Sequence, residues 1–67
     1  MGRLFEGEKL LRLNEVVQLL KTHSLGLEEA EIAGILGWER RTVNNYLREL
    51  ESYQVIYKEG QLWFAEE

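Results

Sequence analysis

The residues best suited to chemical recognition lie between Arg40 and Arg48, a stretch with three arginines, two asparagines and no acidic residue. Arginine and asparagine side chains hydrogen-bond to phosphate oxygens and to the edges of nucleic-acid bases. If the stretch is helical, polar residues three and four positions apart share one face. That face would carry Arg41, Asn45, Arg48 and Ser52, with Asn44 on its flank. The pattern therefore indicates contact with a nucleic acid.

Other kinds of chemistry have little support in this composition. There is one histidine, His23, no cysteine and no aspartate, and no glycine-rich phosphate loop is present. Catalysis and metal binding need several such groups close together. We therefore expect no enzyme activity, no metal, no cofactor and no small-molecule substrate. His23 is expected at a helix end, where a partly cationic ring favours the negative end of the dipole.

The net charge of −4 stands against a nucleic-acid partner, because proteins that bind nucleic acid usually carry a basic excess. Every acid is a glutamate, and none lies between Arg40 and Arg48. A local charge of this kind can contact phosphates even when the rest of the chain is acidic. The sequence therefore predicts modest affinity.

The elements around the Arg40–Arg48 stretch follow from apolar spacing. A helix after Trp38 has a core side with the i, i+4, i+7 pattern, formed by Val43, Leu47 and Leu50. A shorter helix ends at Gly37, which can adopt positive φ and stop a helix sharply. Its expected apolar face consists of Ile32, Ala33, Ile35 and Leu36.

Three glutamates precede that shorter helix: Glu28, Glu29 and Glu31. Negative charge is favourable at a helix N-terminus, so we interpret them as a solvated, dipole-compensating start. Glu28 is expected to be a poor N-cap.

An earlier helix is predicted from Lys9 to His23. Its expected core stripe consists of Leu10, Leu13, Val16, Val17 and Leu20. Leu11 and Leu19 do not fit the stripe, which leaves two alternatives: a helix buried on two sides, or an exposed contact for a partner. In the second case Leu4, Phe5, Leu11 and Leu19 would form a partner or dimer surface.

The C-terminal part of the chain predicts a β-hairpin. Two runs rich in β-branched and aromatic residues flank Glu59-Gly60. Val55 and Tyr57 alternate with Ile56 and Lys58, and Leu62 and Phe64 alternate with Trp63, so one face must pack on the helices. We expect Trp63 in the core or the hairpin packing rather than stacked on a ligand. Trp38 is expected between the second and third helices.

The order helix, helix, helix, hairpin resembles a winged helix-turn-helix domain over roughly residues 9–65. The string from Glu31 to Leu50 is similar to the N-terminal segments of bacterial regulators of the DeoR and WYL-domain kind, which pair an E-I-A, two residues, L-G helix with a second helix opening on R-R-T-V. The resemblance implies a recognition helix at about residues 39–51 in the major groove, with Thr42 on a phosphate. It also implies a wing at about residues 55–64, with Lys58 to Gln61 along the backbone or minor groove. Two positions depart from the pattern: Glu39 stands where the helix cap is usually serine, and Glu59 accompanies Lys58.

The sequence thus predicts one domain over residues 1–67, mainly α with a small β-hairpin, in a three-helix winged helix-turn-helix arrangement. The expected function is sequence-specific binding of double-stranded DNA as the DNA-reading domain of a transcriptional regulator. The DNA contacts would come from Arg40, Arg41, Thr42, Asn44, Asn45, Arg48 and Lys58. The alternative is a winged helix used for protein contact or dimerisation, without DNA binding. Besides DNA, the expected partners are a second copy of the chain or a separate effector or oligomerisation domain. No membrane-spanning run or signal-peptide core is present, so a cytoplasmic location is expected.

Overall fold

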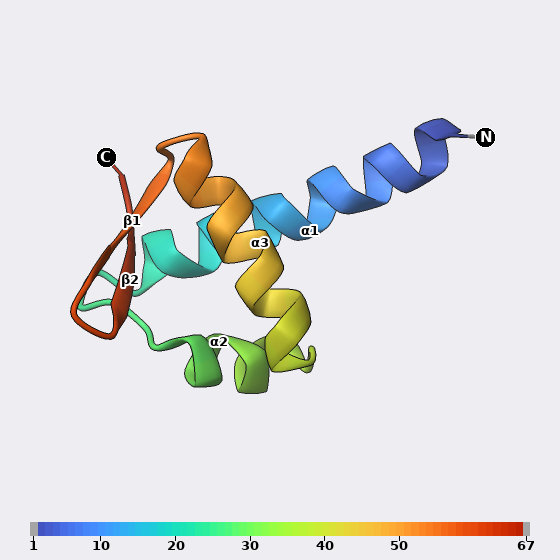
Figure 1. The fold of residues 1–67 in the computed structure, drawn as a ribbon. Helices are drawn as coiled ribbons and strands as arrows, with labels where there is room; N and C mark the ends of the chain where they lie inside the picture. The colour runs from blue at the N-terminus through green and yellow to red at the C-terminus, as the bar shows by residue number, and fades with distance from the viewer. Residues whose placement is uncertain (1, 67) are drawn as a thin grey trace.

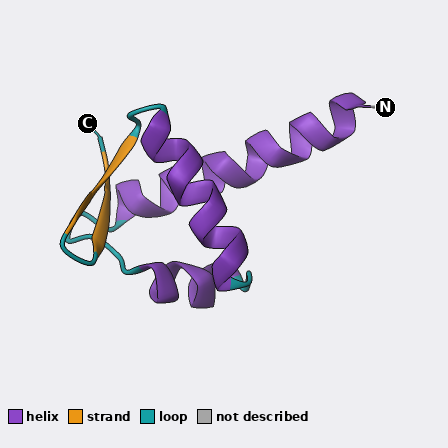
Figure 2. Ribbon diagram, in the orientation of Figure 1, coloured by secondary structure: helices purple, strands orange, loops and turns teal. Residues whose placement is uncertain are grey.

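The computed structural model describes the backbone of residues 2–66 and the side chains of residues 7–66. Three helices, α1 (Gly2–Thr22), α2 (Glu29–Leu36) and α3 (Arg40–Ser52), precede two strands, β1 (Ile56–Glu59) and β2 (Leu62–Ala65). The strands pair as an antiparallel hairpin (Figures 1 and 2). The fold is therefore mainly α with a small β-hairpin, in the layout of a winged helix-turn-helix, as the sequence predicts.

Helix α1 begins at Gly2 rather than at Lys9, so the predicted start is wrong. Figure 1 shows why the pattern missed it: the N-terminal part of α1 extends beyond the rest of the molecule. The long axis of the structure is accordingly 39 Å, against 24 and 18 Å for the other two. A projecting turn needs no apolar stripe, so apolar spacing gives no signal there. Although α1 has 21 residues, neither it nor another helix within residues 2–66 is apolar enough over a sufficient length to cross a membrane.

The core side of α1 is shorter than predicted. Leu13, Val16 and Leu20 are buried, and Val17 packs partly buried against them, but Leu10 is 65% exposed. Leu10 borders an open cleft beside Glu49 and Tyr53 instead of packing into the core. The prediction for Leu10 is therefore wrong.

The two leucines outside the stripe behave differently from each other. Leu19 packs partly buried against the core, so it is not a free contact surface, whereas Leu11 is 67% exposed. The side chains of Leu4 and Phe5 lie outside the described residues. Of the proposed partner surface, the described residues leave only Leu11 exposed.

Helix α2 is held at both ends. Glu28 occupies the N-cap position with an extended backbone, and its N–H donates to the Glu31 carboxylate at 2.9 Å. This bond offsets the poor capping expected of Glu28. At the other end Gly37 has φ 73°, and its N–H donates to the Ala33 carbonyl oxygen at 2.8 Å. The predicted stop at Gly37 is confirmed.

The buried face of α2 is narrower than predicted. Ile32 and Ala33 are buried and Leu36 packs partly buried on the core, but Ile35 is exposed. With 3.6 residues per turn, Ile35 lies about 110° around the helix from the centre of the other three. A helix of eight residues makes one contact face, and Ile35 falls outside it.

Helix α3 and the hairpin close the core. Val43, Leu47 and Leu50 are buried, as predicted. The register pairs Ile56 with Ala65 and Lys58 with Trp63, which places the buried residues of both strands on the side that faces the helices. Trp63 is only 4% exposed, so its assignment to the core is confirmed. The backbone of Trp63 also exchanges two hydrogen bonds with Leu27, which ties the α1–α2 connection to β2.

Trp38 follows α2 and contacts both α3 and α1. Its ring centroid is 5.6 Å from that of Tyr46 in α3, and the Arg12 guanidinium of α1 lies 5.7 Å from the centre of a Trp38 ring. Trp38 therefore joins α3 to α1.

Candidate nucleic-acid interface

The outer face of α3, defined here as Arg41, Asn45 and Arg48, is exposed to solvent. These residues lie opposite the buried Val43 and Leu47, which fix the rotation of the helix. None of the three forms an ion pair or a side-chain hydrogen bond with another side chain among residues 7–66. The outer face therefore offers two cations and one amide without a competing partner in the described structure.

Arg40 and Asn44 are placed differently, because both contact α2. The Asn44 side-chain amide donates to Glu29 Oε1 at 2.9 Å, and Arg40 Nε lies 3.5 Å from Glu29 Oε2. Asn44 is half-buried, as its predicted flanking position suggests. The stretch that is free of acids in the sequence therefore has a carboxylate beside it in space.

The contact made by Glu29 was missed when the α2 glutamates were interpreted as solvated. The signal was present in the spacing: Glu29 precedes the buried Ala33 by four residues and Ile32 by three. It therefore lies one turn before the buried face of α2, on the same side. What the spacing does not provide is the partner, because Asn44 is 15 positions away.

Thr42 does not belong to the outer face. It is half-buried and lies one helical turn before Tyr46, on the side of α3 that faces α1. A phosphate contact by Thr42 would have to be made at the edge of the α1–α3 contact.

The wing supplies one cation near α3. Lys58 is exposed, and its Nζ lies 5.5 Å from the centre of a Trp63 ring. A cleft of about 340 Å³ lies between the wing and the N-terminal ends of α2 and α3. It is lined by Glu28, Glu29, Ala30, Arg40, Lys58, Gln61 and Trp63. Arg40 and Lys58 thus border one polar cleft, together with two carboxylates.

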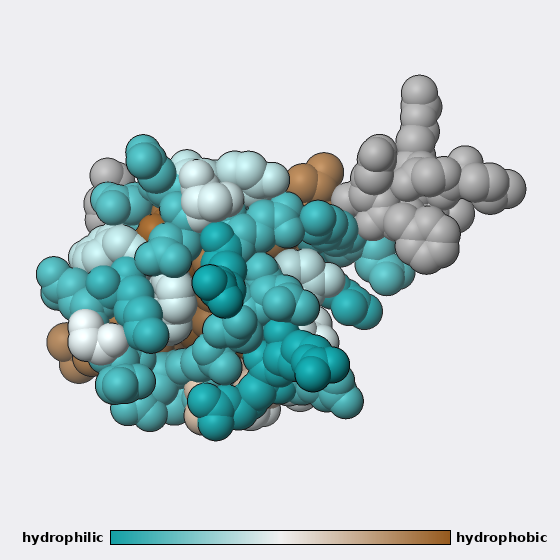
Figure 3. Space-filling view, in the orientation of Figure 1, coloured by the Kyte–Doolittle hydropathy of each residue, from teal (hydrophilic) through white to brown (hydrophobic). Residues whose placement is uncertain are grey.

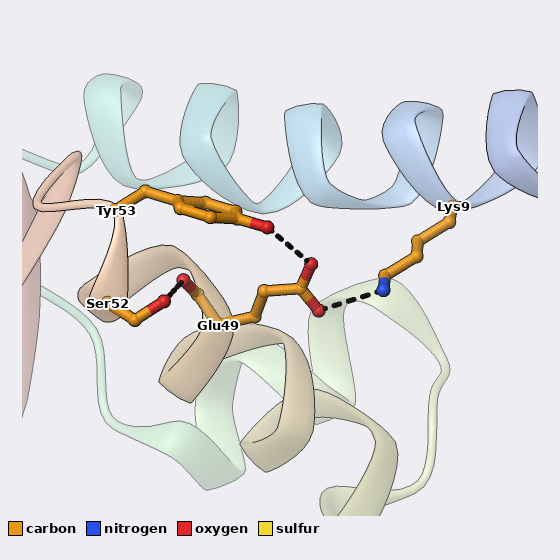
Figure 4. A network of polar contacts seen from close by, with 4 residues as sticks. All are labelled: Lys9, Glu49, Ser52 and Tyr53. Atoms are coloured by element: carbon orange, nitrogen blue, oxygen red, sulfur yellow. Dashed lines mark hydrogen bonds and ion pairs between the residues drawn. The ribbon is translucent and has the colours of Figure 1, made fainter.

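A polar network fixes α3 against α1 (Figure 4). The Glu49 carboxylate accepts from Lys9 Nζ at 3.1 Å and from the Tyr53 hydroxyl at 3.1 Å. The hydrogen bond and the charge of Glu49 raise the pKa of Lys9 above its ordinary value of 10.5. The network turns the Glu49 carboxylate towards α1, although Glu49 directly follows Arg48 in the chain.

The single histidine has a local role. His23 directly follows α1, and its Nδ1 lies 2.9 Å from the Leu19 carbonyl oxygen and 3.1 Å from Thr22 Oγ1. Within the described residues no group of three or more histidine, cysteine or acidic side chains is arranged to hold a metal ion.

The fold and this face together have the layout of a winged helix-turn-helix in which α3 has a polar outer face. No family model matches the chain, and neither a curated protein nor a solved structure shows a significant similarity to it.

Proposed function

We propose that this protein binds double-stranded DNA through the outer face of α3, as the DNA-reading part of a transcriptional regulator in the cytoplasm. The observation that carries the proposal is the unpaired outer face, because arginine and asparagine without competing partners are suited to phosphates and base edges. An exposed helix backed by a core and preceded by a short helix and tight turn is the arrangement that enters the major groove.

The position of each residue would determine which part of the DNA it contacts. Arg41 and Arg48 would contact phosphates on either side of the groove, and Asn45 between them would reach a base edge. Lys58 in the wing would lie along the neighbouring backbone. Arg40 and Asn44 would take part less, because both already contact Glu29.

The charge of the whole chain limits the strength of this binding. A net charge of −4 gives little long-range attraction to a polyanion. Short-range contacts from the outer face would therefore supply most of the affinity, and the affinity would be modest.

An NMR amide titration with a generic DNA duplex at low salt tests the proposal. Shifts concentrated on residues 40–48 and on the wing support it. The matched control is a folded variant with Arg41, Asn45 and Arg48 all replaced by alanine, called here the outer-face triple variant. Equal duplex affinity in this variant and the wild type would exclude the outer face as the DNA-binding surface.

A second candidate function is protein contact through α1. Leu10 and Leu11 are exposed where α1 leaves the body, and Leu10 borders an apolar-lined cleft of about 300 Å³ with Lys9, Leu13, Glu49 and Tyr53. Figure 3 shows a mainly hydrophilic surface with some hydrophobic surface near the N-terminal end.

Sedimentation tests this second candidate function. If it is right, the double substitution Leu10→Ser with Leu11→Ser should abolish concentration-dependent association. A wild-type chain that remains monomeric at millimolar concentration would eliminate dimerisation through α1.

A further inference from the structure

Glu29 is an acidic side chain that contacts two of the residues predicted to bind DNA, Asn44 and Arg40. It is the first residue of α2, and Figure 1 shows α2 lying alongside the N-terminal part of α3. Its two oxygens are both engaged, one by the Asn44 amide at 2.9 Å and one by Arg40 at 3.5 Å. One carboxylate therefore occupies two of the residues that the sequence assigns to DNA binding.

The two partners of this contact differ in exposure. The Glu29 side chain is 22% exposed, whereas that of Arg40 is 68% exposed. Glu29 lies on the inward side of α2, whereas most of the Arg40 side chain is in solvent. The contact thus holds a long, exposed cation against a short, half-buried anion.

A guanidinium binds a carboxylate and a phosphate through the same donors. While Arg40 faces Glu29, a DNA phosphate must either displace the Glu29 carboxylate from Arg40 or bind Arg40 with that negative carboxylate close by. Both alternatives reduce the gain from an added phosphate contact.

We propose that Glu29 limits the affinity of this domain for DNA by holding Arg40, and that removing its charge adds Arg40 to the phosphate contacts. The inference rests on the function proposed above. Glu29 acts here as a positioning residue and makes no contact with DNA itself.

The substitution Glu29→Gln isolates the charge. Glutamine keeps an oxygen that accepts the Asn44 amide hydrogen, but it lacks the charge that holds Arg40. One additional phosphate contact changes the slope of log K against log salt by about −0.9. It raises affinity about fivefold at about 0.15 M salt and about 15-fold at about 0.05 M salt. These changes are expected in fluorescence anisotropy with a generic duplex.

Glu28→Gln is the matched control. Glu28 is adjacent, borders the same cleft and carries the same charge, but among the described residues no ion pair joins it to Arg40. We expect Glu28→Gln to raise affinity less than twofold with an unchanged salt slope. Thermal melting of each variant checks that the fold is retained.

A second control tests whether the affinity gained in Glu29→Gln depends on Arg40. In an Arg40→Gln background, Glu29→Gln should give no further gain, because the added contact is made by Arg40. The Arg40 Nε–H resonance of the free protein should also move in Glu29→Gln and stay in place in Glu28→Gln.

The outcomes separate this inference from the proposed function. If the wild type binds through the outer face and Glu29→Gln gains no more than Glu28→Gln, the role of Glu29 is wrong and the DNA-binding function stands. A gain that persists without Arg40 also overturns the role given to Glu29. If no variant binds duplex and the wild type equals the outer-face triple variant, both proposals fail.

Discussion

At the scale of single residues, position around α3 decides what an arginine can do. Arg40 and Arg41 are neighbours in the sequence and identical in chemistry. A helix separates them by about 100°, so Arg40 turns towards α2 and meets Glu29 while Arg41 projects into solvent. Residue type therefore identifies candidate contacts, and the neighbouring helix determines which of them are available.

Single alanine substitutions on the outer face should separate folding from DNA binding. Arg41→Ala, Asn45→Ala and Arg48→Ala should each change the free energy of unfolding by less than about 0.5 kcal/mol, because these side chains are exposed. Loss of either arginine should weaken binding to all duplexes and reduce the salt slope by about 1. Loss of Asn45 should cost roughly 1–3 kcal/mol on a preferred site only.

Val43→Ala is the control for these substitutions. Val43 is fully buried, so the cavity should lower the free energy of unfolding by about 1–3 kcal/mol. Duplex binding by the folded fraction should remain unchanged. Urea unfolding combined with anisotropy measures both quantities, and an exposed-site variant that unfolds like Val43→Ala would contradict the assigned rotation of α3.

At the scale of elements, the connections fix the orientation of the helices and wing. Gly26 lies in the connection between α1 and α2 with φ 87°, and a Cβ built there would lie 2.7 Å from a ring atom of Phe64 in β2. Gly26→Ala should lower the free energy of unfolding by about 1–3 kcal/mol, because both the backbone and the ring must move. Thermal or urea unfolding measures the change.

Gly34 provides a matched comparison for Gly26. It lies within α2 with open space around its Cβ position, so Gly34→Ala should stabilise the domain by about 0.5–1 kcal/mol. Equal effects at the two glycines would contradict both the positive φ of Gly26 and its close approach to Phe64.

The contact between α1 and α3 should depend on pH through Lys9. The folded-state pKa of Lys9 is raised by Glu49, so its contribution to stability is present below the unfolded value of 10.5 and is lost as pH rises through the folded value. At about pH 8 the melting temperature of Lys9→Gln should lie slightly below that of the wild type. The difference should close as the pH rises above 10.5.

Lys9→Arg is the comparison for this pH dependence, because arginine keeps its charge over the whole range. The melting temperature of Lys9→Arg should stay above that of Lys9→Gln at alkaline pH. If the difference in melting temperature between the wild type and Lys9→Gln persists unchanged at high pH, packing of the lysine stem, rather than its charge, provides the effect.

The sequence predicts most of these elements because their signals are local. The buried side of α3 follows from Val43, Leu47 and Leu50, and the end of α2 follows from Gly37. Leu10 and the start of α1 could not be predicted in the same way, since helical spacing does not tell where neighbouring elements end. The contacts of Glu29 with Arg40 and Asn44 depend on how α2 packs against α3, which is a tertiary property.

At the scale of the whole molecule, the net charge opposes DNA binding, whereas the fold turns two acidic side chains away from the outer face. The chain carries eight basic and twelve acidic residues, so its average field repels DNA. The fold reduces the local effect of two acids: Glu49 faces Lys9 on the α1 side, and Glu29 is turned inward on α2. The outer face of α3 thereby remains locally basic on an acidic molecule.

This arrangement sets a value for the salt dependence of wild-type binding. Four cations border the proposed interface, and one of them, Arg40, is held by Glu29. The remaining three are Arg41, Arg48 and Lys58. At about −0.9 per phosphate contact, the slope of log K against log salt should be about −2.7, and it should not be steeper than about −4 even if Arg40 takes part. Anisotropy titrations with one duplex at several salt concentrations measure it, and binding that does not change with salt would contradict an electrostatic interface.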